Sequence, residues 1–216
     1  MSATIHRLQP RKTPRQRRSR ATRERILGAA ARVFAERGYA GGTTNHIAAE
    51  AGLSVGSLYQ YFPNKDALAA ELMREHAAEG VALVADRLAD VQAGVQSGTG
   101  IGLEGALRSF VDAAVANHRG DPELHRVLFE EAPRPPDVLA ELHELEAAAV
   151  AAGAGLLRTD PTVHVADPTL AAWFVVATIE SLTHRFQGTG GDVDAFADEL
   201  VHLLVAYLRS PRAGGS

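Results

Sequence analysis

The spacing of hydrophobic residues predicts helices along the whole chain and no β-sheet. Apolar residues recur three or four positions apart, as on one face of a helix, and no segment shows the sustained alternation of a half-buried strand. We expect helices at about 22–37, after Thr44, after Ser54, from Asn64 to about 93, and at about 103–119, 122–131, 137–158, 168–187 and 193–209. The predicted fold class is therefore all-α, with about nine helices.

Glycine and polar capping residues mark the ends of several of these helices. Gly38 is placed to stop the first helix, and Gly52 to supply a positive-φ turn between the second and the third. Gly80 is a predicted weak point in the long helix that follows, because glycine is a poor helix former. The expected N-caps are Thr44, Ser54 and Asn64.

The composition is that of a folded protein and excludes several kinds of site. Of the 216 residues, 46% are hydrophobic and 22% are charged, which is typical of a chain that builds a core. The absence of cysteine excludes a disulfide framework, a thiolate zinc site and a cysteine nucleophile. Since no stretch resembles a signal peptide or a spanning helix, we expect a soluble cytoplasmic protein with no membrane partner.

Charge is distributed unevenly along the chain. Residues 1–75 contain 13 Lys or Arg and 6 Asp or Glu, whereas residues 76–216 contain 9 and 20. A basic segment attracts phosphates and an acidic one is repelled by them. The N-terminal part is therefore the part that would face a nucleic acid.

Residues 43–62 have the pattern of a helix-turn-helix motif. Two short helices pack at a steep angle only when small residues lie where they touch, and Ala48 and Ala51 allow that approach beside the turn at Gly52. We expect a small core, shared with the first helix, to be formed by Ile47, Leu53, Leu58 and Phe62. The residues expected to face outward are Val55, Gly56, Ser57, Tyr59, Gln60 and Tyr61.

The outward residues suit a major groove. Gly56 and Ser57 keep the leading turn of the second motif helix thin, and Gln60 is able to pair with adenine. Tyrosine hydroxyls reach phosphate oxygens. The alternative for each aromatic residue is ordinary packing on an amphipathic helix.

Residues 22–75 closely resemble the N-terminal domain of the TetR (tetracycline-repressor-like) family of transcriptional regulators. The resemblance is carried by Ile26, Ala29, Ala30, Phe34, Gly38, Tyr39, Thr43, Thr44, Ile47, Ala48, Ala51, Gly52, Leu53, Ser54, Leu58, Tyr59, Tyr61, Phe62, Lys65 and Leu68. It implies a three-helix DNA-binding domain, followed by an all-helical C-terminal domain that binds small molecules and dimerises. It further implies a repressor that a ligand releases from DNA.

The same resemblance implies roles for individual residues. Phosphate contacts would fall on Thr44, Tyr59, Tyr61 and Lys65. Base reading would fall on Asn45, Val55, Gly56, Ser57 and Gln60. The expected partner is double-stranded DNA in the nucleoid, with a palindromic operator, because a dimer presents two recognition helices about 34–36 Å apart.

Three segments follow from these observations. Residues 1–19 are expected to be a disordered basic arm, residues 20–80 the DNA-binding domain and residues 81–216 the C-terminal domain. The arm and the residue that follows it supply candidate minor-groove or phosphate contacts at Arg15, Arg17, Arg18 and Arg20. The alternative is a tail that only improves solubility.

The last two predicted helices are apolar on nearly every side. A helix of this kind must be covered on two sides, and a four-helix interface with a second copy does so. We therefore expect a homodimer through residues 168–208, as the resemblance also implies. The alternative is a monomer in which both helices are fully buried.

Ligand binding in the C-terminal domain is expected to tilt the helix over 64–93 and so to move the recognition helices.

The sequence offers little to identify an effector. The candidate pocket residues are Phe110, Phe129, Leu142, His143, Trp173 and Phe174, although aromatic residues at helical spacing are more often plain core. Candidate polar anchors are His118, His125, His143 and His184. No cluster with metal-ligand spacing is readable, so we expect no metal and no cofactor, and an apolar small molecule as the effector.

Other functions fit the sequence less well. No Ser/His/Asp order, phosphate-binding glycine loop or carboxylate pair stands out, so we expect that the chain is not an enzyme. A DNA-binding activator or a ligand-independent regulator remains as the main alternative. A pure protein-interaction module is disfavoured by the basic N-terminal segment.

Overall fold

The computed structural model of the chain describes residues 14–118, 120, 122–186 and 189–210. The helices are α1 (Pro14–Gly41), α2 (Thr44–Glu50), α3 (Val55–Tyr59), α4 (Lys65–Ser97), α5 (Gly102–His118), α6 (Pro122–Arg126), α7 (Pro136–Thr159), α8 (Pro168–Phe186) and α9 (Val193–Arg209), with one turn of π-helix, η1 (Val127–Glu131), after α6. Among the described residues there is no strand, so the all-α prediction is confirmed.

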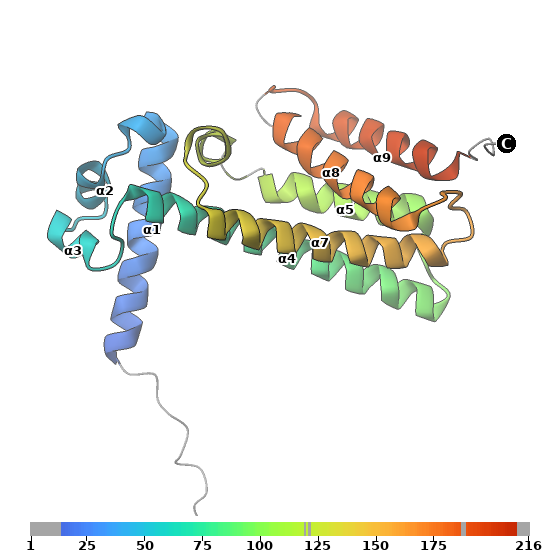
Figure 1. Cartoon of the computed structure of the whole chain (residues 1–216), viewed down its shortest axis with the longest axis horizontal. Coiled ribbons are helices and arrows are strands. Elements are labelled where there is room, and N and C mark those ends of the chain that lie inside the picture. Colours follow the sequence, from blue (N-terminus) through green and yellow to red (C-terminus); the bar gives the residue numbers. More distant parts are fainter. Residues whose placement is uncertain (1–13, 119, 121, 187–188, 211–216) are drawn as a thin grey trace, which may run out of the picture.

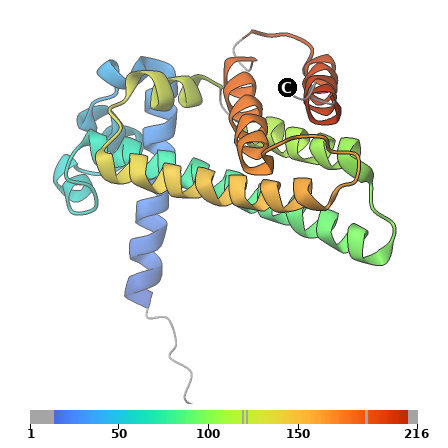
Figure 2. The same cartoon turned by 45° about the vertical axis from the view of Figure 1, so that its right-hand side comes forward.

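The helices form two units (Figure 1, Figure 2). The N-terminal unit consists of α1, α2, α3 and the first turns of α4, with α1 standing across the end of the long α4. The C-terminal bundle consists of the rest of α4 together with α5, α7, α8 and α9. Because α4 is continuous, it joins the two units directly, as the sequence predicts. None of the described helices combines the length and hydropathy needed to cross a lipid bilayer.

Capping side chains fix where the helices begin. Ser54 and Asn64 accept backbone N–H groups of Ser57 and Ala67 at 3.1 and 2.8 Å, which confirms both predicted caps. The prediction that Thr44 caps the second helix is wrong. Thr43 occupies that position, where its hydroxyl accepts the N–H of His46 at 3.3 Å. Thr44 is the first residue of α2 instead.

Two glycines show how the backbone turns and packs. Gly38 has φ +67° and interrupts the helical conformation inside α1, which confirms the predicted stop. Gly80 does not break α4. A Cβ there would lie 2.9 Å from the Asn117 side-chain nitrogen, so the glycine permits close approach of α5.

The start of α1 corrects the prediction of a disordered arm over 1–19. From Pro14 onward the chain is helical, with proline in the first turn where its missing N–H is not needed. The Thr22 hydroxyl donates to the Arg18 carbonyl at 2.9 Å, and Arg20 pairs with Glu24 at 2.8 Å one turn later. These local contacts stabilise a helix that the basic composition concealed. Residues 1–13 of the predicted arm lie outside the described residues.

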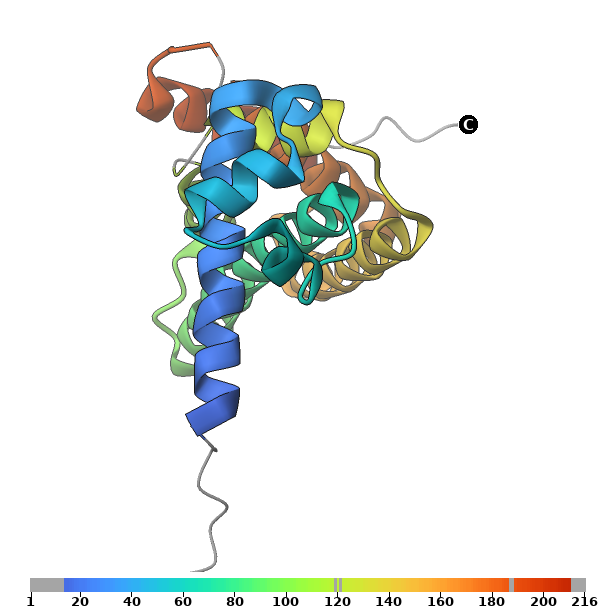
Figure 3. The ribbon, with the colours of Figure 1, turned by 90° about the vertical axis from the view of Figure 1, so that its left-hand side faces the viewer.

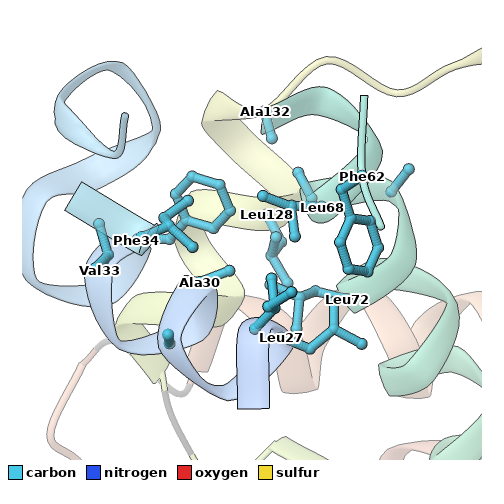
Figure 4. Close-up of a cluster of buried hydrophobic side chains, with 14 of the residues drawn as sticks. Leu27, Ala30, Val33, Phe34, Phe62, Leu68, Leu72, Leu128 and Ala132 are labelled. Carbon is cyan, nitrogen blue, oxygen red and sulfur yellow. The ribbon is translucent and has the colours of Figure 1, made fainter. Parts of the chain in front are cut away.

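Two hydrophobic cores correspond to the two units. The core of the N-terminal unit gathers side chains from α1, α2, α3 and α4, and Leu128 of η1 lies among Phe34, Leu68 and Leu72 (Figure 4). Val127 and Val138, from η1 and α7, are also fully buried there. The core of the C-terminal bundle joins α5, α7, α8 and α9. The N-terminal core is therefore completed by a segment of residues 81–216, the predicted C-terminal domain.

Leu128 provides a test of that arrangement. We expect Leu128→Ala to lower the free energy of unfolding by about 2–5 kcal/mol, because the side chain is 3% exposed and its removal leaves a cavity. Ile101→Ala, at a side chain that is 57% exposed, is the matched control and should change the value by less than about 0.5 kcal/mol. Urea denaturation followed by circular dichroism measures both. Equal effects of the two substitutions would contradict the placement of η1 in the core.

Candidate DNA-binding surface and effector region

The residues of the helix-turn-helix motif pack as the sequence predicts. Ile47 and Leu58 are completely buried and Phe62 is nearly so, against α1. Gly52 has φ +63°, and the N–H of Leu53 donates to the Ala48 carbonyl at 2.9 Å to close the turn. The burial of Ala48 and Ala51 where α2 and α3 meet confirms the role of small residues there.

The outer face of α2 and α3 lies at the end of the molecule away from the C-terminal bundle (Figure 1, Figure 3). Asn45, Gly56, Tyr59 and Gln60 are exposed on it, and Ser57 is half-buried. The Thr44 and Tyr59 hydroxyls lie 3.2 Å apart, so a candidate phosphate contact on α2 is joined to one on α3. The structure thus brings these candidate residues together on one surface.

The side chains of three other candidate DNA-contacting residues are engaged in contacts within the protein. Val55 and Tyr61 are half-buried and pack partly against the N-terminal core. Lys65 donates from Nζ to the Tyr39 carbonyl at 2.8 Å, and Nζ lies 4.0 Å from the centroid of the Tyr39 ring. An ammonium group has three donors, so this anchoring leaves Lys65 able to contact a phosphate at the edge of the surface.

A salt-bridged clamp fastens η1 to the turn that follows the kink of α1. Glu131 accepts the backbone N–H of Tyr39 at 2.9 Å and pairs with Arg126 at 2.6 Å. These two hydrogen bonds, the one from Tyr39 first, lower the pKa of Glu131 below its ordinary value. A Cβ on Gly38 would lie 3.0 Å from the Glu131 carboxylate, so glycine also leaves room for the clamp. The sequence gives no local signal for this contact.

Four histidines meet where α4, α5, α6 and α8 come together. His118 and His125 have ring centroids 4.7 Å apart, and His184 lies 4.3 and 4.2 Å from them. His76 lies 5.1 Å from His118 and 4.9 Å from His125. Phe129 stacks on His125 with a centroid separation of 4.4 Å and closes one side. Three candidate anchors, His118, His125 and His184, are therefore brought together.

Burial keeps these imidazoles uncharged near neutral pH. Loss of hydration, followed by repulsion from neighbouring imidazoles, lowers the pKa of His76 to about 4, of His184 to about 3 and of His125 to about 2. Burial likewise lowers the pKa of His118, partly offset by a hydrogen bond to the Ala114 carbonyl. Four neutral rings therefore gather in one place.

The candidate pocket residues do not converge on a single site. Phe129 lies at the histidines, whereas Leu142 packs against the N-terminal core and Phe110 against the core of the C-terminal bundle. His143 is exposed on α7. Trp173 and Phe174 contact each other on α8 and are 45% and 44% exposed. The histidine cluster was not readable from sequence because its members come from four helices, and His76 was not among the candidates.

The fold and the exposed motif define a class of protein: a helix-turn-helix DNA-binding protein whose DNA-binding unit is followed by a separate helical bundle. Two segments of the chain match models of known protein families. Residues 26–72 match the model of bacterial regulatory proteins of the tetR family, and residues 103–208 match the tetracycline-repressor-like C-terminal domain. The chain belongs to the TetR family of transcriptional regulators, which confirms the resemblance found in the sequence. Members of this family are DNA-binding transcription factors, in agreement with the prediction that the chain is not an enzyme.

Individual relatives resemble the chain in different ways. The HTH-type transcriptional regulator LmrA of Bacillus subtilis (strain 168) is 39% identical over 80 residues, which are 35% of this chain and 43% of that protein. The transcriptional regulator FadR of Bacillus subtilis, solved in complex with stearoyl-CoA, matches with a TM-score of 0.66 at 20% identity, over 85% of this chain and 97% of the FadR chain. AibR, solved in complex with isovaleryl coenzyme A and operator DNA, matches with a TM-score of 0.62 at 19% identity, over 88% of this chain and 99% of the AibR chain. The two structures show the shared fold.

The turn of the motif allows a test that does not require an operator. We expect Gly52→Ala to lower the free energy of unfolding by about 1–2 kcal/mol, because a side chain strains the left-handed backbone although nothing lies within 4 Å of its Cβ. Gly56→Ala, inside the helix α3, is the control and should not destabilise the protein. Thermal and urea denaturation measure both variants. Destabilisation by Gly56→Ala alone would contradict the assigned turn.

Proposed function

We propose that the protein is a dimeric transcriptional repressor that a small effector, bound in the C-terminal bundle, releases from an inverted-repeat operator. It would act in the cytoplasm, on the nucleoid. The observation that carries this proposal is the exposed outer face of α3 beside α2, in a unit whose buried face is fully packed against α1. That face presents small residues at its leading turn and hydrogen-bonding residues behind them.

The proposed contacts follow from the position of each side chain. Gln60 is exposed and has an amide that donates to and accepts from an adenine edge. Tyr59 presents a hydroxyl beside that of Thr44, and the pair suits a phosphate oxygen. Base reading is further assigned to Asn45, Val55, Gly56 and Ser57, and phosphate contacts to Tyr61 and Lys65.

Basic residues near the N-terminus extend the same surface. Arg17, Arg18 and Arg20 are exposed on the first turns of α1, and Arg15 precedes them in the same helix. We place these residues along the phosphate backbone or the minor groove, next to the half-site read by α3. Each phosphate that they neutralise adds to the salt dependence of binding, because it releases condensed counterions.

An uncovered apolar surface on α8 and α9 supports the homodimer through residues 168–208. Its exposed side chains are Leu170, Trp173, Phe174, Leu182 and Leu203, each at least 38% exposed. The fully buried monomer predicted as the alternative would have covered them within one chain. A second copy packed on α8 and α9 completes a four-helix interface and sets the spacing of the two recognition helices.

Two solved relatives support a choice of effector class. FadR was solved with stearoyl-CoA and AibR with isovaleryl coenzyme A, and both of these ligands carry an acyl chain. An apolar or amphipathic small molecule between the helices of the C-terminal bundle is therefore the effector class that we propose. Its binding would reach the recognition helices through α4 and through the Glu131 clamp on Tyr39.

Substitution of Gln60 tests the reading surface. We expect Gln60→Ala to raise the Kd for the protein's own upstream DNA by about 5- to 150-fold, the loss of one bidentate base contact, and to leave binding to unrelated DNA unchanged. Gln92→Ala removes another exposed glutamine, on α4, and should leave both Kd values unchanged. Fluorescence anisotropy over a salt series measures them. Equal effects of Gln60→Ala on both DNAs would contradict base reading by this residue.

Substitution of Leu203 tests the interface. We expect Leu203→Glu to shift the protein from dimer to monomer and to weaken operator binding, because it places a charge in an apolar contact. The control is Val95→Glu on α4, where the side chain is 63% exposed but lies outside α8 and α9. Sedimentation equilibrium gives the mass of each variant. A wild-type monomer, or a dimer that both substitutions leave intact, would contradict the proposed interface.

A further inference from the structure

We propose that His76, His118, His125 and His184 form a binding site for one divalent transition-metal ion of the zinc type. The inference goes beyond the proposed function, because it assigns a chemistry to four side chains that DNA binding and dimerisation do not use. Neutral imidazole is a preferred ligand of Zn²⁺, Co²⁺, Ni²⁺ and Cu²⁺, and four nitrogen donors suit a tetrahedral ion.

The donor atoms already lie close together. One ligand atom on each of His76, His118 and His125 lies within 4.8 Å of those on the other two, and the ring of His184 contacts two of these rings. A tetrahedral zinc ion with Zn–N bonds of about 2.1 Å needs nitrogen atoms about 3.4 Å apart. The nitrogen atoms therefore have to approach one another by about an ångström, through rotation of the side chains and a small shift of α6.

The hydrogen bond of His118 orients its free nitrogen as a ligand. A carbonyl oxygen only accepts, so the contact of 2.6 Å between Nδ1 and the Ala114 oxygen places the proton on Nδ1 and the lone pair on Nε2. The side chain of His118 is 94% buried, since its exposed fraction is 6%, and Nε2 has no hydrogen-bond partner. Carbonyl-bound imidazoles of this kind are typical of metal sites.

The surroundings of two further nitrogen atoms, on His125 and His76, distinguish the cluster from an ordinary core. Nε2 of His125 is also buried without a partner, although a buried polar atom normally finds one. Nε2 of His76 lies 3.3 Å from the side-chain nitrogen of Asn117, and this contact gives way to the ion when His76 binds through Nε2. Two unpartnered nitrogen atoms in one cluster, with neutral rings on four sides, are explained together by an ion that accepts their lone pairs.

The cluster is connected to the DNA-binding unit by a short path. His125 lies in the last turn of α6, η1 begins two residues later, and Glu131 at the end of η1 holds the backbone of Tyr39. A metal ion that draws α6 toward α4, α5 and α8 would shift η1 against α1. The regulatory consequence, a weaker operator complex in the presence of metal, rests on the proposed function, whereas metal binding itself does not.

Metal binding is tested on the untagged full-length protein, stripped with a chelator and without DNA. Calorimetric titration with Zn²⁺ should show one ion per chain, and Co²⁺ should give the visible absorption of a tetrahedral nitrogen-bound ion. His125→Gln and His76→Gln should each weaken binding by at least about 10-fold. The control, His143→Gln, removes an exposed histidine from α7 and should bind as the wild type does. Circular dichroism verifies that each variant is folded.

The outcomes separate the site from its role. The metal site is overturned if the wild type binds no more Zn²⁺ than His125→Gln and His76→Gln do. It is also overturned if the control variant His143→Gln fails to bind Zn²⁺. A wild type that binds one ion, with operator affinity at least 5-fold weaker in Zn²⁺, supports both parts. If the ion binds and operator affinity is unchanged, the regulatory role is overturned and the site stands. A protein that binds Zn²⁺ but no operator refutes the proposed function alone.

Discussion

The hydrogen bond from the Tyr39 backbone to Glu131 is the contact on which the relation between the two halves of the molecule depends. It connects residues 92 positions apart, at the point where α1 turns toward the helix-turn-helix motif. Leu128, one turn earlier, is buried in the N-terminal core. The helix-turn-helix unit is therefore packed on a segment of the chain that follows directly on α6 and the histidine cluster. We therefore expect a change in α6 to reach α1 through this contact.

This second connection changes how a signal would travel. The sequence predicts a single path, through the long helix that joins the domains, and α4 runs through both units. The path through α6 and η1 ends beside the kink at Gly38, where the backbone is already non-helical. A turn of π-helix at this place is consistent with a functional position, since such turns are common at functional sites. Ion pairs from Arg74 to Asp137 and Glu141 hold α4 to α7 nearby.

Local chemistry explains what the sequence could predict. The turn at Gly52 and the caps at Ser54 and Asn64 depend on neighbours within three residues, so their signals are readable in the chain itself. The helical start of α1 was missed because a basic, proline-containing segment resembles a disordered arm. Thr43 and Thr44 are both good caps, and only the backbone shows that Thr43 occupies the position.

Contacts between distant segments explain what could not be predicted. The four histidines are spread over 109 positions, from His76 to His184, on four helices, and no spacing rule connects them. Their convergence depends on the packing of α5 against α4, for which Gly80 leaves room beside Asn117. The insertion of Leu128 into the N-terminal core similarly depends on the path of the chain. Aromatic residues proposed as one pocket, such as Phe110 and Trp173, are instead divided between a core and an exposed surface.

The role of η1 in positioning the helix-turn-helix motif is tested by the operator affinity of Glu131→Ala compared with that of Glu130→Ala. The first substitution removes the acceptor of the Tyr39 N–H and the partner of Arg126, whereas the second removes an exposed carboxylate one residue away. If η1 positions the helix-turn-helix motif, Glu131→Ala changes the Kd for operator DNA by at least about 5-fold, which is the lower end of typical coupling between sites. Glu130→Ala leaves this Kd as in the wild type. Equal affinities for the wild type and both folded variants would show that the Glu131 contact does not position the helix-turn-helix motif.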